Sequence, residues 1–352
     1  MSEALSISEF KEAFDVELQH CLAEKVKDVS ALTKDAYLQH LVEHATKIVM
    51  AGGKRVRPYV AYLMYVGCGG TDTAATGYFT GLELFHSFAL MHDDIIDRGA
   101  TRHGIPTMHE FAIDGLEGST EHVRHIAEGQ AIMVGDLLQH WAYEEIERRI
   151  PHAYKLSALK IFHEMNNAVI IGEMLDVKLA AQKTATKQEV MDKTALKTAY
   201  YTFVHPMRLG AATAGCGEEH DEFCKGYGLA LGTAFQIQDD LMDILGNAKK
   251  LGKPTFSDLA EGQHTFFTQH IRDNGTAKQQ KELAALFGKP VDDAARAAAQ
   301  ALFEESGAIE AGKQSIDDYC NKALGHLASA ECSAEIRELW TVLVEKMRVR
   351  KE

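Results

Sequence analysis

Two acidic clusters of identical spacing are the residues of this sequence that could do chemistry. Asp93, Asp94 and Asp97 end the stretch 82–97, and the same Asp-Asp-x-x-Asp pattern recurs at 239–243. On a helix, side chains four residues apart share a face at about 5–6 Å, so the carboxylates repel one another. They also oppose the helix dipole at a C-terminus. Such a cluster favours a hard cation that binds oxygen, such as Mg²⁺.

The repetition of the pattern separates two interpretations. A single Asp-Asp-x-x-Asp is usually a solvated helix end, as with any short motif. The second copy, Asp239, Asp240 and Asp243, again follows an apolar helical pattern, here from Leu229 to Ile237. Two copies in matching contexts favour a pair of metal-binding clusters over two unrelated helix ends.

Composition excludes several classes of protein. The 352 residues suffice for a sizeable core. The net charge of −14, without a basic stripe, argues against nucleic acid as the main partner. The N-terminal residues lack a signal-peptide pattern, and no apolar run approaches the roughly 18–20 residues of a membrane span. The 6 cysteines show no Cys-x-x-Cys spacing. We therefore expect reduced thiols in a cytoplasmic protein that does not span a membrane.

Helical periodicity dominates the elements that must position these clusters. The apolar pattern predicts helices at about 8–29, 36–50, 74–97, 121–149, 153–181, 187–202 and 219–245 and after Pro58 and Pro206. Loops are predicted at 98–119 and 246–262, and the C-terminal third is helical with turns at Gly288, Gly307, Gly312 and Gly325. The predicted fold class is all-α: one domain, residues 1–352, with long helices around a central cavity lined by the site.

Cations accompany the acidic clusters. A group of Mg²⁺ ions needs an anionic ligand, and phosphate groups are its usual companions. Candidate phosphate-binding side chains are Lys54, Arg55 and Arg57, which follow a Gly-Gly pair, and Arg102, Lys197 and Lys253. Each one alone is more often a solvated surface charge. The cavity between the two cluster helices would be lined by Leu84, Phe85, Phe88, Ala89 and Phe235. This arrangement suits a substrate with a diphosphate head and a hydrocarbon tail.

The motifs together resemble those of the trans-isoprenyl diphosphate synthases, the polyprenyl synthetase family, over about residues 35 to 270. Gly-Gly-Lys-Arg-Val-Arg-Pro at 52–58 resembles the isopentenyl diphosphate site of that family, and 93–97 and 239–243 resemble its two aspartate-rich motifs. Further matches are Gly172-Glu173-Met174-Leu175-Asp176, Lys197-Thr198, Phe235-Gln236 and Lys253. The resemblance implies the isoprenoid synthase fold, a homodimer, and condensation of isopentenyl diphosphate with an allylic diphosphate.

The resemblance also implies a role for each matching residue. Three Mg²⁺ ions would be bound with substrate, held by Asp93, Asp97 and Asp239, while Asp94, Asp240, Asp243 and Asp176 order the metal-bound water. Isopentenyl diphosphate would be bound by Lys54, Arg57, His86 and His103, and the allylic diphosphate by Arg102, Lys197 and Lys253. The Lys197 carbonyl, the Thr198 hydroxyl and the Gln236 amide would face the reacting carbons.

Two positions depart from the family pattern. His103 stands where a second arginine is usual, and histidine is a weaker, pH-dependent cation. We therefore expect weaker binding of isopentenyl diphosphate above pH 7. Gln263 stands where the family usually has a lysine, which removes one cation for the allylic diphosphate.

Product length is expected to depend on Phe88 and Ala89, just before the first cluster. Phe88 lies five residues before Asp93, about 7–8 Å along a helix. In the family an aromatic ring at this place would close the floor of the tunnel, which favours farnesyl or geranylgeranyl diphosphate. The alternative is that Phe88 only packs in the core.

Three other functions compete with chain elongation. A class I terpene cyclase shares the fold and the first motif but needs no second diphosphate site. A metal phosphohydrolase of the HD type would use His92-Asp93, yet the second cluster contains no histidine. A catalytically silent partner subunit would commonly have lost aspartates, and all six are present here.

Overall fold

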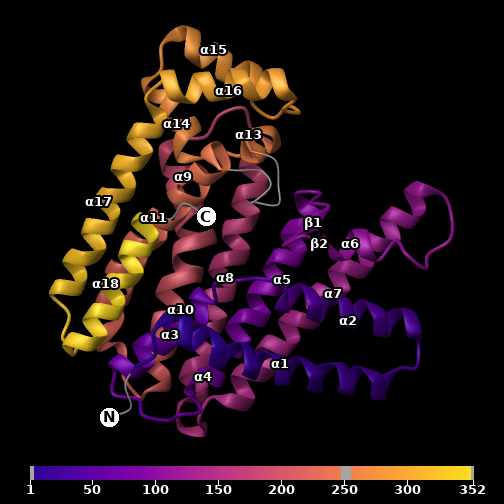
Figure 1. Cartoon of the computed structure of the whole chain (residues 1–352), viewed down its shortest axis with the longest axis vertical. Coiled ribbons are helices and arrows are strands. Elements are labelled where there is room, and N and C mark those ends of the chain that lie inside the picture. The colour runs from indigo at the N-terminus through magenta and orange to yellow at the C-terminus, as the bar shows by residue number, and fades with distance from the viewer. Residues whose placement is uncertain (1–3, 247–254, 350–352) are drawn as a thin grey trace. The chain divides into compact units, whose positions relative to one another are not determined.

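The computed structural model describes residues 4–246 and 255–349, and nearly all of their regular structure is helical (Figure 1). The strands in this part of the chain are β1 (Thr101–Arg102) and β2 (Ile105–Pro106), a short antiparallel pair. The predicted all-α class is therefore confirmed. The chain divides into two compact units, residues 1–159 with 210–215 and residues 160–209 with 216–352. The single domain and its central cavity stay predictions.

The first unit is built around the pair α5 and α7, which pack along much of their length. Its helices are α1 (Ile7–Leu32), α2 (Ala36–Met50), α3 (Val56–Gly67), α4 (Ala75–Tyr78), α5 (Thr80–Ile96), α6 (Met108–Phe111), α7 (Thr120–Arg149) and η1 (His152–Tyr154). Aromatic rings fill the core where α1 meets α3: Phe10 lies 5.4 Å from Phe14 and 4.9 Å from Tyr62 between ring centroids. These contacts anchor the N-terminal helix on the unit that carries the first acidic cluster.

The second unit is organised around α11 (Asp221–Leu245), which packs against both η2 (Thr194–Val204) and α17 (Ala308–Ala328). The other helices of this part of the chain are α8 (Lys155–Ala180), α9 (Lys187–Lys193), α10 (His205–Thr213), η3 (Glu218–His220), α13 (Ser257–Glu261), α14 (Phe266–Asn274), α15 (Ala277–Leu286), α16 (Asp293–Glu305) and α18 (Ala334–Arg348). Its central helix thus carries the second acidic cluster.

Capping boxes fix several helix starts. Ser6 caps α1, because its hydroxyl accepts the Glu9 N–H while the Glu9 carboxylate accepts the Ser6 N–H at 2.9 Å. The sequence placed this start at Ser8, two residues late. Thr186 and Glu189 form the same box at the start of α9. The helices at 36–50, 121–149 and 153–181 were predicted to within a few residues.

Two predicted boundaries were wrong. The helix expected over 74–97 breaks at the fully buried Phe79, which separates α4 from α5. The turns expected at Gly312 and Gly325 lie inside α17. Gly312 has a packing role, because a Cβ at that position would overlap the Phe267 ring. Gly312 thus permits close packing of the helix, whereas a Cβ at Gly325 would meet no atom within 4 Å, and neither glycine ends α17.

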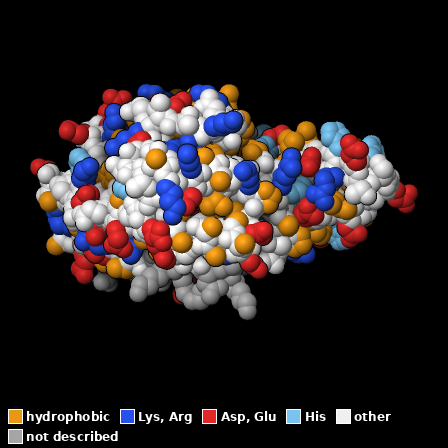
Figure 2. Space-filling model, turned by 90° about the horizontal axis from the view of Figure 1, so that it is seen from above, with side chains coloured by type: hydrophobic (Ala, Val, Ile, Leu, Met, Phe, Trp, Pro, Cys, Tyr) orange, Lys and Arg blue, Asp and Glu red, His pale blue; other side chains and the backbone are white. Residues whose placement is uncertain are grey.

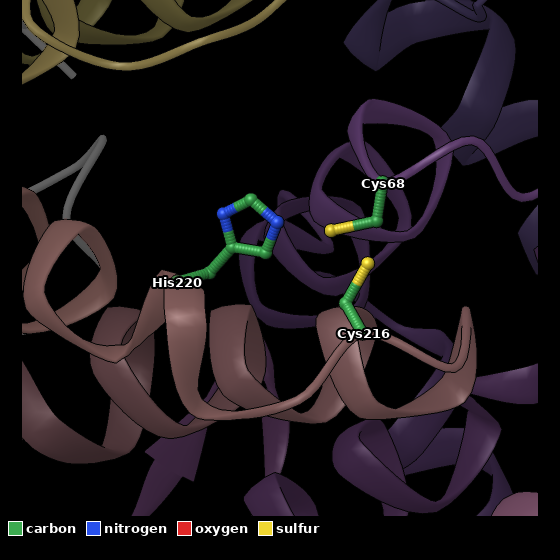
Figure 3. A group of neighbouring side chains, drawn as sticks. All are labelled: Cys68, Cys216 and His220. Atoms are coloured by element: carbon green, nitrogen blue, oxygen red, sulfur yellow. The ribbon is translucent and has the colours of Figure 1, made fainter.

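All six cysteines are free thiols, as expected. His220 ends η3 and Cys216 lies just before it in the second unit, and Cys68 follows α3 in the first (Figure 3). Two side chains within one unit do not complete the four ligands of a structural metal site.

The surface carries both signs of charge. On the face drawn in Figure 2, acidic and basic side chains are interspersed, without a continuous basic stripe. None of the described helices is both long and apolar enough to cross a membrane.

Candidate active site

The first acidic cluster lies at the C-terminal end of α5, where Asp97 is the C-cap residue. Asp94 is buried, and it is bound by Arg102 of β1. The Arg102 Nε donates to both Asp94 oxygens at 2.9 Å, and its Nη2 donates to Oδ1 at 2.6 Å. Asp93 Oδ2 lies farther away, 3.8 Å from the same Nη2. The negative charge of Asp94, in the middle of the cluster, is therefore balanced by Arg102 from the segment that follows α5.

A hairpin places Arg102 on this cluster. β1 and β2 are joined by His103 and Gly104, whose φ angles of 51° and 80° are typical of a tight hairpin turn. His44 of α2 holds the hairpin, since its Nε2 lies 2.9 Å from the Pro106 carbonyl oxygen. The His44 ring also stacks on Phe111 of α6 at 3.7 Å. His44 thus fixes the segment 98–119, which was predicted as a loop, through Pro106 and Phe111.

Burial dominates the electrostatics of Asp94. It raises the pKa of the Asp94 carboxyl, although the Arg102 guanidinium favours the ionised form. Arg102 was expected to bind the allylic diphosphate, and Asp94 was expected to order metal-bound water. In the structure the two side chains bind each other, so a substrate diphosphate would compete with Asp94 for the guanidinium.

The loop expected to bind isopentenyl diphosphate is fixed by Arg55. Arg55 is buried in the left-handed region, with φ of 52°. Its Nη1 lies 2.6 Å from Glu83 Oε1 on α5, and its Nε lies 2.8 Å from Asp15 Oδ1 on α1. Two carboxylates therefore balance this charge inside the first unit. Arg55 orients the junction between Lys54 in the loop and Arg57 in the first turn of α3, instead of presenting its own charge to a ligand.

His86 and His103 belong to the same part of the first unit. Burial holds the pKa of His86 well below its usual value, and the nearby Arg57 and Arg102 guanidinium groups lower it further. The His103 pKa is also lowered, first by burial and then by Arg102 and Arg55. A Cβ on Gly52 would lie 2.6 Å from the His103 ring. Both histidines are therefore neutral near pH 7, and the structure brings them close to the arginines of the predicted site.

The side chain expected to set product length lies on the α7 side of α5. The Phe88 ring is buried, 5.1 Å from Phe85 and 4.7 Å from His92. His92 Nε2 in turn lies 3.1 Å from the Ile132 carbonyl oxygen of α7. Ala89 is only partly buried and lies four residues before Asp93, on the same face of α5.

The second acidic cluster lies within the last turns of α11. Asp240 and Asp243 are buried, and Asp239 is half-buried. Asp243 accepts the Ser257 hydroxyl at 2.7 Å and the N–H groups of Ser257 and Asp258 at 3.1 and 3.2 Å. The Asp243 carboxylate therefore accepts hydrogen bonds from the first residues of α13.

A chain of hydrogen bonds joins Thr198 to this cluster through Gln236. The Thr198 hydroxyl donates to Gln236 Oε1 at 2.5 Å, and Gln236 Nε2 donates to Asp240 Oδ1 at 2.7 Å. Both ends of the Gln236 amide are thus used within the protein. Since the Thr198 hydrogen points to Gln236, the lone pairs of its oxygen are left for another group.

The Asp240 carboxyl is poised between two protonation states. Burial raises its pKa to about 7, against the hydrogen bond from Gln236 and the positive charge of Lys193, while Asp239 and Asp243 raise it further. A small pocket of about 10 Å³ borders Asp240 and Asp243, which is room for about one water. A divalent cation would favour the ionised carboxyl, and a donor set made only of oxygens suits Mg²⁺. The residues present therefore fit this metal.

Lys197 and Lys193 share one carboxylate. Lys197 Nζ lies 2.7 Å from Asp176 Oδ2 and 2.9 Å from Glu173 Oε2. Lys193 Nζ lies 2.9 Å from Asp176 Oδ1 and 3.5 Å from Gln263 Oε1. Burial alone would raise the pKa of Asp176, but the two ammonium groups prevail and hold it below its usual value. Lys253 lies outside the described residues.

Lys197 and Thr198 belong to η2, a π-helical segment of 11 residues. Such segments are rare, and they are frequent at functional sites. Close packing holds this one in place: a Cβ on Gly172 of α8 would lie 2.5 Å from the Lys197 backbone nitrogen, and one on Gly232 of α11 would overlap Ala199. The glycine of the predicted motif at 172–176 is therefore required by the approach of two helices.

Sequence reasoning missed two contributors. Glu83 lies in an apolar helical pattern, and Lys193 lies four residues before Lys197. A charged residue inside an apolar pattern is a usable signal for Glu83, because buried charges need partners. Lys193 gave no such signal, since its burial depends on Asp176 and Gln263, which are distant in sequence.

Comparisons with known proteins agree with the geometry. A family model described as polyprenyl synthetase matches residues 38–305. The chain is 28% identical over 324 residues to a short chain isoprenyl diphosphate synthase of Methanothermobacter thermautotrophicus, covering 92% of each chain. It is 31% identical over 275 residues to the synthase of the same description from Methanocaldococcus jannaschii, covering 78% of each.

A solved structure gives the same result. Geranylgeranyl pyrophosphate synthase from Corynebacterium glutamicum, complexed with isoprenyl diphosphate and magnesium, matches with a TM-score of 0.91 and 26% identity, over 98% of this chain and 100% of that one. The chain therefore belongs to the polyprenyl synthetase family, has its all-α isoprenoid synthase fold, and is a prenyltransferase that elongates prenyl diphosphates.

Proposed function

We propose that the protein catalyses the Mg²⁺-dependent 1′-4 condensation of isopentenyl diphosphate with an allylic diphosphate, giving all-trans farnesyl or geranylgeranyl diphosphate. The observation that carries this proposal is the network of the second unit, where Thr198, Gln236 and Asp240 are linked and Lys197 lies on Asp176. It combines a buried carboxylate, a cation for a phosphate and an oriented hydroxyl oxygen. These groups suit a reaction in which a diphosphate leaves and positive charge develops on carbon.

Each acidic cluster offers oxygen ligands for Mg²⁺. We assign Asp93, Asp97 and Asp239 to direct binding of three Mg²⁺ ions, and Asp94, Asp240 and Asp243 to the surrounding water and hydrogen bonds. When bound, Mg²⁺ would withdraw charge from the allylic diphosphate as its carbon–oxygen bond breaks. The Corynebacterium glutamicum structure is a complex with magnesium, which supports the choice of metal.

The chain's own residues hold both substrates and stabilise the developing charge. Lys197, Lys253 and Arg102 bind and neutralise the allylic diphosphate. The oxygen lone pairs of Thr198 face the developing positive charge, together with the Lys197 carbonyl. Gln236 contributes by orienting Thr198 and Asp240, since both ends of its amide are bound to them.

Isopentenyl diphosphate would be held where the loop that Arg55 fixes meets the start of α3. Lys54 and Arg57 supply the charge, and His86 and His103, both neutral near pH 7, supply hydrogen bonds. The double bond of isopentenyl diphosphate forms the new carbon–carbon bond. The released diphosphate accepts the proton that is then lost, so no side chain needs to be a strong base.

Product analysis tests the reaction. The protein would be incubated with isopentenyl diphosphate and the dimethylallyl, geranyl or farnesyl primer, with Mg²⁺ and with EDTA. We expect a discrete elongated diphosphate only with Mg²⁺. An intact allylic primer in every reaction would instead indicate a silent partner subunit. A cyclised hydrocarbon formed without isopentenyl diphosphate would indicate a terpene cyclase.

Product length is proposed to depend on Phe88 and Ala89. Replacing Phe88 by Ala should lengthen the product by one or more isoprene units, because the ring closes the tunnel. The matched control is Phe88→Leu, which keeps much of the side-chain volume and should leave the length unchanged. If Phe88→Ala makes the wild-type product, the ring is a core residue and not a floor.

We also propose that the protein is a homodimer. Four large apolar side chains of α8 are exposed, by 41% at Ile170, 55% at Ile171, 67% at Met174 and 45% at Val177. Their spacing places them on one face of the helix, and such a stripe is typical of a subunit interface. Light scattering should show a dimer that Met174→Lys weakens. A wild-type monomer at micromolar concentration would contradict the proposal.

A further inference from the structure

Lys193 is a buried cation that the proposed reaction does not yet use. It is the last residue of α9, four positions before Lys197, and its side chain is only 11% exposed. A buried ammonium group is costly unless it is paired and hydrogen-bonded. Its partners are Asp176 on α8, at 2.9 Å, and Gln263, at 3.5 Å. Three segments distant in sequence therefore meet at this one nitrogen.

Asp176 is divided between two lysines. Its Oδ1 binds Lys193 and its Oδ2 binds Lys197, so each oxygen holds one ammonium group. Lys197 is more exposed, at 29% of its side chain, and it also contacts Glu173. While Lys193 occupies Oδ1, Lys197 is confined to Oδ2 and the Glu173 side. Without Lys193, the Lys197 ammonium could move over both oxygens and deeper into the unit.

Gln263 reaches the same position from another element. Its Oε1 lies 3.5 Å from the Lys193 nitrogen, in the segment that follows α13. A lysine at 263 would carry its ammonium group toward the Asp176 oxygen that Lys193 now occupies. Two ammonium groups this close repel each other strongly in a buried site. The space beside Asp176 Oδ1 therefore accommodates one ammonium group, which a lysine at position 193 or at position 263 could supply.

We propose that Lys193 is a positioning residue for the allylic substrate: it holds Asp176 so that the Lys197 ammonium group stays directed toward the diphosphate. The same charge supplied from position 263 should serve equally well. This inference depends on the proposed function, in which Lys197 binds the allylic diphosphate.

Steady-state kinetics of three variants and the melting temperature of a fourth test the proposal. Lys193→Met should raise KM for the allylic primer by about tenfold, which corresponds to about 1.4 kcal/mol, and leave KM for isopentenyl diphosphate within about twofold. Lys193→Arg should retain most of the primer affinity, because it keeps the charge. The double variant Lys193→Met with Gln263→Lys should recover it to within about threefold, by the same conversion. Gln263→Lys alone should lower Tm, since it crowds two charges.

A matched control separates this role from a general effect of losing a lysine. Lys178 of α8 is 55% exposed and lies 3.3 Å from Glu189. Lys178 is near Asp176 in sequence but is paired with Glu189. Lys178→Met should therefore change neither the KM for the allylic primer nor the KM for isopentenyl diphosphate. Equal rises in both KM values for Lys193→Met, with no recovery in the double variant, would overturn the proposal and leave Lys193 a structural residue.

A binding measurement keeps the inference distinct from the proposed function. Calorimetric titration of the full chain with inorganic diphosphate and Mg²⁺ needs no turnover. We expect Lys193→Met to weaken diphosphate binding and the double variant to restore it. If the wild type fails to elongate any primer but the binding pattern holds, the reaction is wrong and the positioning is right. If the wild type elongates and Lys193→Met binds diphosphate normally, the positioning is wrong.

Discussion

The two acidic clusters have the same sequence pattern but different partners. In the first, the middle carboxylate, Asp94, receives a two-pronged ion pair from Arg102. In the second, the corresponding Asp240 receives a hydrogen bond from a neutral amide, that of Gln236. Both carboxylates are buried to a similar degree, at 5% and 7% exposure. The difference between them therefore comes from their neighbours.

That difference decides how each cluster is charged before any metal binds. Burial raises the pKa of both carboxyl groups, but only that of Asp240 reaches about 7. Among the described residues, Asp94 is hydrogen-bonded to a guanidinium, whereas Asp240 is hydrogen-bonded to a neutral amide and is favoured in its ionised form by the charge of Lys193. A sequence motif thus specifies the carboxylates, and the tertiary contacts specify how readily each one ionises.

Removing the Asp94 charge should have the largest effect. Asp94→Asn removes the hydrogen-bonded carboxylate of the partly buried Arg102 guanidinium, which then has Asp93 at 3.8 Å, and breaking such a pair costs about 3 kcal/mol. Denaturant unfolding of the metal-free protein would measure this loss, and product formation should fall with it. If Asp94→Asn is as stable as the wild type, the Arg102 ion pair does not stabilise the first cluster and the proposed difference between the two clusters is wrong.

Asp240→Asn should act in the opposite direction on the metal-free protein. It removes a buried carboxylate whose pKa is raised to about 7 despite the charge of Lys193, so Tm at pH 8 should rise by about 2–4 °C. Mg²⁺ should then stabilise the wild type more than the variant. A Tm that falls at pH 8 without metal would show that Asp240 is already compensated.

The pH dependence of this effect follows from its sign. The folded-state pKa of about 7 lies above the ordinary value of 3.8. Between these values the folded state holds a proton that the unfolded state has released. The contribution of Asp240 to the free energy of unfolding is therefore fully present below about pH 4 and is lost as pH rises toward 7. Above pH 7 this contribution no longer changes with pH. The difference in unfolding free energy between wild type and Asp240→Asn should follow this course.

The sequence was sufficient for the carboxylate positions and most helix bounds, because both depend on local spacing. It could not tell which cation pairs with which carboxylate. Arg55 was one of the candidate phosphate-binding cations, yet its charge is balanced by Asp15 and Glu83. Such pairs join α1, the loop at 51–55 and α5, and no periodicity in the chain encodes them.

The π-helical segment η2 was also beyond prediction. The apolar pattern at 187–202 fits a helix but does not distinguish its hydrogen-bond register. The register depends on contacts with Gly172 and Gly232, on two other helices. Sequence reasoning placed Lys197 and Thr198 correctly on a helix and missed what orients them.

The third carboxylates of the two clusters should differ by a smaller amount. Asp243 accepts three hydrogen bonds from Ser257 and Asp258, so Asp243→Asn should cost about 1–2 kcal/mol. Asp97 caps the C-terminus of α5, where a negative charge opposes the helix dipole. Asp97→Asn should therefore gain about 0.3–1 kcal/mol without metal. Thermal unfolding in EDTA checks both signs, and equal losses would remove this distinction.

His103→Arg should have the smallest effect, and it tests whether the hairpin beside the first cluster can use more charge. The lowered pKa of His103 leaves it neutral at pH 7, so the wild-type KM for isopentenyl diphosphate should improve only as pH falls below about 6.5. A permanent guanidinium should lower that KM about threefold above pH 7 and remove the pH dependence.

The gain is limited by the surroundings of His103. Arg102 and Arg55 already lower its pKa, so a third positive charge is repelled before the substrate arrives. His103→Gln is the matched control, because it keeps a hydrogen-bonding group but cannot be charged, and its KM should not vary with pH. If His103→Arg has an unchanged or higher KM at pH 8, the first cluster and its hairpin already hold all the positive charge that the substrate can use.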